Sequence, residues 1–185
     1  LTQLPGNVPL NEHIDRLLER KIGFCACYFD IDHFKPFNDV FGYRRGDDII
    51  GLLAQTLTQI TNPLSDFCGH IGGDDFMVLF QSEDWEARCQ QALTRFDQQL
   101  SAQIESTSLV VVDGLRGYDA ENRRGQMVFH PLPSLSIGAI PVNPEYFESH
   151  REISAAASEA KKHAKKTAGS SLFIERRQPA HPASR

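Results

Sequence analysis

Hydrophobic residues recur at helical spacing in several stretches of the chain. Apolar side chains mark one face of residues 9–18, of residues 46–61 and of residues 85–104. Residues three and four apart lie on the same side of an α-helix, so each stretch predicts an amphipathic helix. A further helix, rich in Ala and Lys, is predicted over residues 145–166. A short helix is predicted to begin near Phe34, where Pro36 falls in the first turn and costs no hydrogen bond.

Short runs of β-branched, aromatic and other apolar residues predict strands between these helices. The predicted strands cover residues 23–30, 65–71, 76–81, 108–112, 127–129, 135–140 and 172–174. Strands and helices mix without strict alternation, which favours an α+β fold in which helices flank a central, mostly antiparallel sheet.

Length and composition indicate one globular domain. The chain has 185 residues, of which 41% are hydrophobic and 23% charged, and these values are typical of a folded domain. We expect the domain to span residues 1–176, followed by a disordered tail over residues 177–185. The formal net charge of −5 argues against a non-specific nucleic-acid binder, which needs a basic surface to displace counterions from phosphates.

The four cysteines lie in apolar patterns without metal-ligand spacing, so they are interpreted as buried thiols of a cytoplasmic protein. The histidines are scattered, and no zinc site is predicted. No apolar run approaches the length of a membrane span, and no signal peptide is visible. The chain does not begin with Met, which suggests a fragment of a longer protein whose targeting or membrane segments can lie outside it.

Acidic residues occur at two predicted strand ends. The strand over residues 23–29 runs into Asp30 and Asp32, and residues 72–76 read Gly-Gly-Asp-Asp-Phe between two strand-like runs, a pattern typical of a hairpin turn. If the strands are neighbours, Asp30 and Asp74 converge, and their carboxylates suit Mg²⁺. Taken singly, the second motif is usually an ordinary turn, and an acid after a strand is usually a solvated end or a helix cap.

The segment after Asp30 is predicted to turn from strand into helix, which directs backbone N–H groups near Phe34 and Lys35 outward beside the two acids. Helix N-termini bind phosphate through such donors. An isolated Lys35 would more often be a solvated surface lysine, but here it adds positive charge to a site suited to a triphosphate.

Several motifs together resemble the GGDEF domains, the diguanylate cyclases. The third and fourth positions of the signature are Asp-Asp here, which gives the variant motif GGDDF. The remaining similar segments are residues 2–7, Asp-Ile-Asp-His-Phe-Lys at residues 30–35, Asn38-Asp39, Phe41-Gly42, Gly46-Asp47, Leu-Ser-Ile-Gly at residues 135–138 and Ala164-Lys165. The resemblance covers about residues 1–175 and implies a fold like that of nucleotide cyclases and polymerase palm domains.

The resemblance also implies residue roles. Asp30, the Ile31 carbonyl and Asp74 would hold Mg²⁺ or Mn²⁺, and Asp74 and Asp75 would be the catalytic residues. Residues implied to bind GTP are Phe34, Lys35, Asn38, Asp47 and Lys165, with Asn38 and Asp47 at the guanine edge. An amide and a carboxylate can pair with the O6 acceptor and the N1/N2 donors of guanine.

Departures from the family pattern affect the site. The fourth motif position is Asp75 rather than Glu, so its carboxylate is one methylene shorter and is expected to hold a second metal less well. Lys161-Lys162 replace the usual Leu-Tyr, and Ser170 replaces a phosphate-binding Arg. The family's product-inhibition site, Arg-x-x-Asp, is degenerate because Pro63 replaces the Arg while Asp66 remains. Residues 106–133 are longer than usual and predict an added β-hairpin.

The leading function is therefore a diguanylate cyclase domain that condenses two GTP into cyclic di-GMP plus two pyrophosphates at a dimer interface. The alternative is a GTP-binding regulatory domain of low or no activity that controls an attached domain, such as an EAL phosphodiesterase in the same longer bacterial chain. A purely structural dimerisation module explains none of the motif residues. The partners implied are GTP and a second GGDEF domain, with no nucleic acid.

Overall fold

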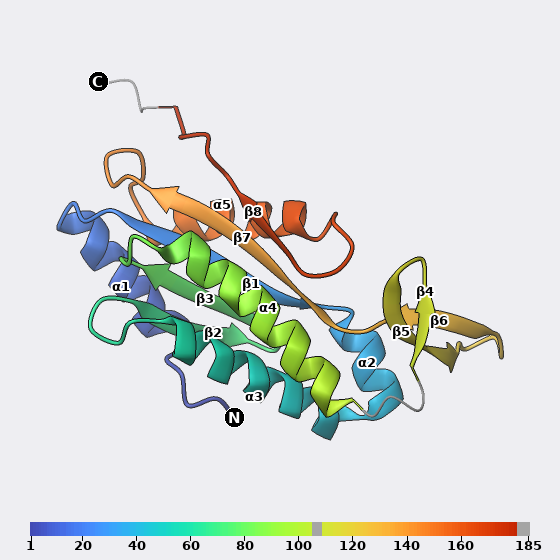
Figure 1. Cartoon of the computed structure of the whole chain (residues 1–185). Coiled ribbons are helices and arrows are strands. Elements are labelled where there is room, and N and C mark those ends of the chain that lie inside the picture. The colour runs from blue at the N-terminus through green and yellow to red at the C-terminus, as the bar shows by residue number, and fades with distance from the viewer. Residues whose placement is uncertain (105–108, 181–185) are drawn as a thin grey trace.

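A computed structural model of the chain describes residues 1–104 and 109–180 (Figure 1). Its helices are α1 (Asn7–Glu19), α2 (Phe34–Phe41), α3 (Tyr43–Ile60), α4 (Trp85–Gln103) and α5 (His150–Ala164). Its strands are β1 (Phe24–Asp32), β2 (Phe67–Gly72), β3 (Asp75–Phe80), β4 (Val110–Val112), β5 (Leu115–Glu121), β6 (Met127–Pro131), β7 (Ser134–Val142) and β8 (Ser171–Ile174). The predicted α+β fold is confirmed.

A five-stranded sheet with the order β2-β3-β1-β7-β8 forms the centre of the molecule. Its pairs are antiparallel except for the parallel pair of β7 and β8. Strand β1 is the middle strand, so both of its neighbours are fixed by hydrogen bonds along its length. Its register places Asp30 opposite Asp75 of β3 on one side and Ser136 of β7 on the other.

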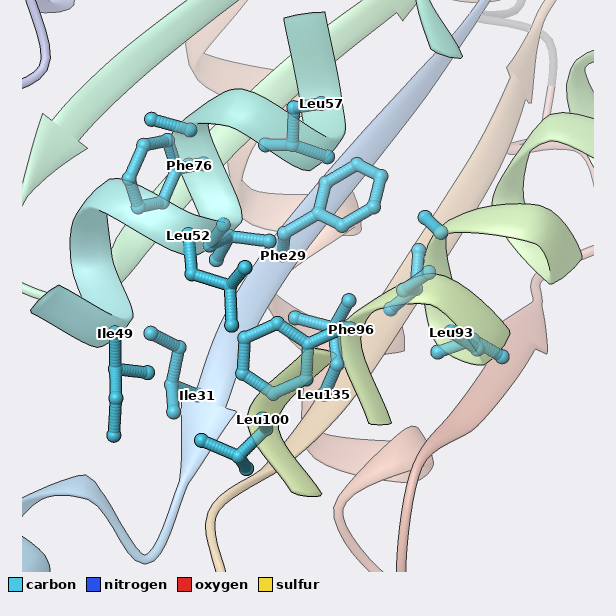
Figure 2. Close-up of a cluster of buried hydrophobic side chains, with 14 of the residues drawn as sticks. Phe29, Ile31, Ile49, Leu52, Leu57, Phe76, Leu93, Phe96, Leu100 and Leu135 are labelled. Carbon is cyan, nitrogen blue, oxygen red and sulfur yellow. The ribbon is translucent and has the colours of Figure 1, made fainter. Parts of the chain in front are cut away.

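Helices cover both faces of this sheet (Figure 1). Side chains of a strand alternate between the two faces, and β1 follows this rule. Its odd-numbered residues join the core under α3 and α4, where Phe29 and Ile31 meet Leu57 and Phe96 (Figure 2). Its even-numbered residues face the other way, where Phe24 and Ala26 pack with the apolar faces of α1 and α5. This second face carries the candidate site.

Several element boundaries differ from the sequence prediction, among them three that lie near the site or shift by several residues. Strand β1 continues to Asp32, so Asp30 lies inside the strand instead of at its tip. Helix α3 begins at Tyr43, directly after Gly42, which takes a positive φ of 85°. Helix α5 is shorter than predicted, because the segment after β7 folds as turns before His150. The turns before His150 are as polar as α5 itself, so the spacing of apolar residues does not reveal where this helix begins.

The segment inserted between α4 and β7 is larger than the predicted hairpin. Strands β4, β5 and β6 form a separate three-stranded antiparallel sheet, which extends from one end of the molecule beside α2 (Figure 1). The sequence analysis missed β5 because charged and polar residues make up much of it. Its Tyr118 is 2% exposed and packs edge-on against Phe37 and Phe41 of α2. Residue 108 of the predicted strand 108–112 lies outside the described residues.

The cysteines are all free thiols. Cys25, Cys27 and Cys89 are buried, as predicted, while Cys68 is half-buried. Burial raises the pKa of the Cys27 thiol, so this group stays protonated and packs as a small apolar side chain. Among residues 1–104 and 109–180, no helix is long and apolar enough to cross a membrane. The predicted tail begins in irregular structure, and its residues 181–185 lie outside the described part of the chain.

Candidate active site

The face of the sheet that packs against α5 changes from apolar to polar along β1. Alternation places Tyr28, Asp30 and Asp32 on this face, beyond the apolar Phe24 and Ala26. Asp30 and Asp32 are only 7% and 8% exposed. Two carboxylates are therefore held in a mostly buried position, where each needs a cationic or hydrogen-bonding partner.

Two lysines of α5 supply those partners. Lys161 Nζ lies 2.9 Å from Asp30 Oδ2 and 3.1 Å from Asp75 Oδ1, while Lys165 Nζ ion-pairs with Asp30 Oδ1 and lies 3.0 Å from Asp32 Oδ1. The two lysines are four residues apart and so share one face of the helix.

The remaining oxygen of Asp32 is also occupied. The hydroxyls of Ser134 and Ser136 donate hydrogen bonds of 3.0 Å and 2.7 Å to Asp32 Oδ2. Asp32 is thus a structural anchor for Lys165, and its own lone pairs are largely used within the protein.

Gly138 allows α5 to approach the sheet closely. A Cβ atom at this position would lie 2.1 Å from the backbone nitrogen of Lys161 and 2.5 Å from the carbonyl carbon of Ala160. Gly138 is also the register partner of Tyr28, and Lys161 Nζ lies 4.2 Å from the centre of the Tyr28 ring. The glycine therefore sets the distance at which Lys161 reaches across β1 to β3.

Asp74 lies in the turn between β2 and β3. The turn consists of Gly73 and Asp74, and Gly73 takes a left-handed φ of 58°, which glycine adopts without strain. His70 stabilises this turn, since its Nε2 is 2.9 Å from the Gly73 carbonyl oxygen and its Nδ1 is 3.0 Å from Thr2 Oγ1. The His70 ring also stacks on Phe76.

The acidic groups perturb one another. Burial raises the pKa of Asp74, and the negative charges of Asp30 and Asp75 raise it further. Burial also raises the pKa of Asp75, although the hydrogen bond from Lys161 opposes the shift. Burial disfavours the charged form of Lys161, but its bonds to Asp30 and Asp75 outweigh this effect and raise the lysine pKa above its ordinary value. Such mutual shifts are typical of functional sites.

The donor set fits a divalent cation that arrives with a phosphate ligand. Within the described residues, no group of three or more His, Cys, Asp or Glu side chains forms a ready-made metal cage. Mg²⁺, however, is usually held by one or two carboxylates together with substrate phosphates. Asp30 and Asp74 are the carboxylates that the sequence predicts as ligands, and both oxygens of Asp30 pair with Lys161 and Lys165 in this structure. The Ile31 side chain is buried in the core (Figure 2), so only its backbone carbonyl could contribute.

The residues predicted to bind GTP lie on α2, α3 and α5. Lys35 is exposed in the first turn of α2, and Asp47 is exposed just after the first turn of α3. Phe34 and Asn38 are half-buried on α2, and Lys165 belongs to the carboxylate cluster. No hydrogen bond or ion pair joins the α2 and α3 residues to that cluster in the described part of the chain.

Asn38 has a close neighbour in Gly46. Its Oδ1 is buried without a hydrogen-bond partner, and a Cβ atom at Gly46 would lie 1.8 Å from this oxygen. Gly46, which directly precedes Asp47, has no side chain, and the Asn38 amide occupies the space that a side chain there would need. An unsatisfied buried amide oxygen is costly, and it marks a position where a ligand donor would be favourable.

Asp66 of the degenerate Arg-x-x-Asp motif has a structural role. Its carboxylate accepts hydrogen bonds from the backbone N–H groups of Asn62, Gln81 and Ser82 at 2.8 to 3.0 Å and from the Ser82 hydroxyl. It thereby joins the loop after α3 to the end of β3. Pro63 offers neither charge nor a backbone donor.

Three contributors to the site were missed in the sequence analysis. The sequence pattern assigned no role to Asp32, presented Lys161 only as a departure from the family pattern, and placed Tyr28 within a predicted strand without a function. The spacing of the two lysines, four residues apart, was an available signal that both face the same element. Alternation along β1 likewise indicated that Tyr28, Asp30 and Asp32 share a face.

Comparison with known proteins agrees with the motifs. A family model described as diguanylate cyclase, GGDEF domain, matches residues 1–171. The chain is 30% identical over 138 residues to diguanylate cyclase DgcP of Pseudomonas aeruginosa. This match covers 70% of this chain but only 20% of DgcP. It is 26% identical over 88 residues to the bifunctional diguanylate cyclase/cyclic di-GMP phosphodiesterase MucR of the same organism, covering 45% of this chain and 13% of MucR.

Among solved structures, the fold is similar to the GGDEF domain of YfiN (TpbB) from Pseudomonas aeruginosa. The TM-score is 0.69 at 21% sequence identity, and the match covers 96% of this chain and 100% of that domain. This likeness concerns the fold. The chain spans about one fifth of the length of DgcP.

Proposed function

The chain belongs to the GGDEF family of diguanylate cyclases, and from this premise we propose that it condenses two GTP molecules into cyclic di-GMP with release of two pyrophosphates. The observation that carries the proposal is the cluster of Asp30 and Asp75 with Lys161 and Lys165, held beside Asp74 on one face of the sheet. Opposite charges at this density suit a triphosphate substrate with a divalent cation.

Asp30, the Ile31 carbonyl and Asp74 are the proposed ligands for Mg²⁺ or Mn²⁺. The bound ion would offset the negative charge of the phosphates. Asp74 is also the proposed proton acceptor for the 3′-hydroxyl, a step that the bound ion itself could promote. Asp75 orients Lys161 through their ion pair and adds negative charge to the site.

Separate groups of residues are proposed to bind the guanine base and the phosphates of GTP. Asn38 and Asp47 would read the guanine edge, where the unpartnered amide oxygen of Asn38 could accept a hydrogen bond from the base. Phe34 and Lys35, at the start of α2, would contact the phosphates through backbone N–H groups and a positive charge. Lys165 would exchange part of its contact with Asp30 and Asp32 for a phosphate.

Each domain would bind one GTP, so the reaction requires a second domain that presents its nucleotide in the opposite orientation. Catalysis then depends on positioning and electrostatics. We also propose that the chain acts in the cytoplasm as part of a longer bacterial protein, because it spans a small share of the length of its relatives. An EAL phosphodiesterase is one candidate for the attached domain.

The decisive experiment is a turnover assay with GTP and Mg²⁺ that measures cyclic di-GMP and pyrophosphate. We expect specific activity to rise with protein concentration in the micromolar range, because two domains must meet, and to be absent with ATP or without a divalent ion. A specific activity independent of concentration in a protein that remains monomeric would contradict the two-domain reaction.

A regulatory GTP-binding domain of low activity is the second candidate. It is favoured by Ser170, whose hydroxyl donates to Asp97 Oδ1 at 2.6 Å and accepts from the Leu135 N–H at 2.9 Å. Ser170 thus brings no positive charge to the place where the family has Arg. GTP binding without pyrophosphate release would support this second function.

We predict that cyclic di-GMP does not bind tightly through the Arg-x-x-Asp position. Pro63 lacks the guanidinium, and Asp66 is already saturated by backbone donors. The Asp66→Ala variant should leave any cyclic di-GMP affinity unchanged. It should lower the free energy of unfolding by about 1–3 kcal/mol, because buried N–H groups lose their acceptor. Titration calorimetry and denaturant unfolding measure the two effects, and sub-micromolar binding that Asp66→Ala abolishes would contradict the prediction.

A further inference from the structure

Lys161 occupies the place between two carboxylates that a cation would otherwise take. Its ammonium group contacts Asp30 Oδ2 at 2.9 Å and Asp75 Oδ1 at 3.1 Å, and the Tyr28 ring lies 4.2 Å below it. The Lys161 side chain is only 12% exposed. Two acceptors and one aromatic face therefore hold this charge between the two strands.

The close packing of α5 on β7 favours this position of Lys161. Gly138 brings the backbone of Lys161 against β7, so the side chain has a short path across β1 to β3. Asp30 and Asp75 are register partners on these two strands. Their charges would repel each other strongly without a cation between them, and Lys161 provides that cation as part of the polypeptide.

The two lysines also reduce the negative charge of the acidic cluster. The ammonium groups of Lys161 and Lys165 pair with Asp30, Asp32 and Asp75, and Asp74 lies nearby. These four carboxylates and two ammonium groups have a net charge of −2 when all are ionised, before a nucleotide adds its own negative charge. A second divalent ion between Asp30 and Asp75 would have to displace Lys161, because Mg²⁺ draws its ligands to about 2.0–2.1 Å and repels a neighbouring ammonium.

We infer that Lys161 is a built-in cation that replaces one divalent ion in this site, so that each nucleotide is bound with a single Mg²⁺ or Mn²⁺ on the Asp74 side. The inference rests on the proposed function, because it assumes that the site binds a nucleotide. Neither the ion count nor the nucleotide-free Mn²⁺ affinity described below requires the domain to turn over GTP. In this role Lys161 is a positioning residue for Asp30 and Asp75.

The test is the number of Mn²⁺ ions bound, counted by electron paramagnetic resonance with a non-hydrolysable GTP analogue. The wild-type protein should bind one ion per domain and Lys161→Met should bind two, because methionine is of similar length but leaves Asp30 and Asp75 free. Lys162→Met is the matched control. Lys162 lies next along α5, is 66% exposed and pairs with Glu159 on the same helix, so this variant should bind one ion.

A second measurement needs no nucleotide. Lys161→Met should bind Mn²⁺ at least about tenfold more tightly than the wild type, since a nearby charge commonly changes an ionic equilibrium by one to three powers of ten. Its melting temperature should be lower than that of the wild type in chelator and should recover with Mn²⁺, while Lys162→Met should show neither effect.

Two wild-type ions per domain, or equal Mn²⁺ affinity in the wild type and Lys161→Met, would overturn the inference. Absence of nucleotide binding in every variant would instead refute the proposed function, and the nucleotide-free affinities would still decide the role of Lys161. If Lys161→Met does not fold, the wild-type ion count decides alone.

Discussion

The Asp74→Asn variant is expected to lose cyclic di-GMP formation by a factor of about 10²–10⁴, the range typical of removing a general base. The substitution keeps the shape of the side chain and removes its charge. Asp74 lies in the two-residue turn before β3, beside the charges of Asp30 and Asp75. Without its carboxylate, the site loses both a proposed metal ligand and the proposed proton acceptor.

Loss of fold should not cause this effect. Burial and neighbouring charges raise the pKa of Asp74, so its ionised form opposes folding at pH values above its unfolded pKa. Asparagine removes this cost, and the melting temperature at neutral pH should therefore equal or exceed that of the wild type. Asp119→Asn, at an exposed position on β5, is the control for a lost aspartate charge and should keep full activity. Full activity in Asp74→Asn would exclude Asp74 from the reaction.

The Gly138→Ala variant is expected to lose about 1–3 kcal/mol of folding free energy, the usual cost of overpacking a dense interior. The new Cβ atom would lie 2.1 Å from the backbone nitrogen of Lys161. Backbone cannot rotate away as a side chain can, so α5 must move away from β7. This movement would also draw Lys161 from Asp30 and Asp75, and the loss of stability should be accompanied by weaker nucleotide binding.

Gly51→Ala provides the matched control. Gly51 lies within α3 with open space around its Cβ position, so alanine should stabilise the protein by up to about 1 kcal/mol through helix propensity. The same substitution should therefore lower the free energy of unfolding at Gly138 and raise it at Gly51. Denaturant unfolding measures both, and a Gly138→Ala protein as stable as the wild type would show that α5 can shift without cost.

Local signals in the sequence were sufficient for much of the fold. Apolar periodicity located α1, α3 and α4, and the Gly-Gly pair located the turn between β2 and β3, because these features depend on residues a few positions apart. The polar strand β5 and the boundaries of α5 were not located. Strand β5 forms because it pairs with β4 and β6 and packs Tyr118 on α2, and such distant contacts leave little trace in local composition.

The motifs around Asp30 and Asp74 were sufficient to identify the family, because they are contiguous and carry their own turn chemistry. The way in which these carboxylates are neutralised depends on contacts between distant segments. The register of β1 and β3 makes Asp75 the partner of Asp30, and the close packing of α5 on Gly138 brings Lys161 between them. Electrostatic energy depends on distances between charges, and these distances are set by strands and a helix that lie far apart in the chain.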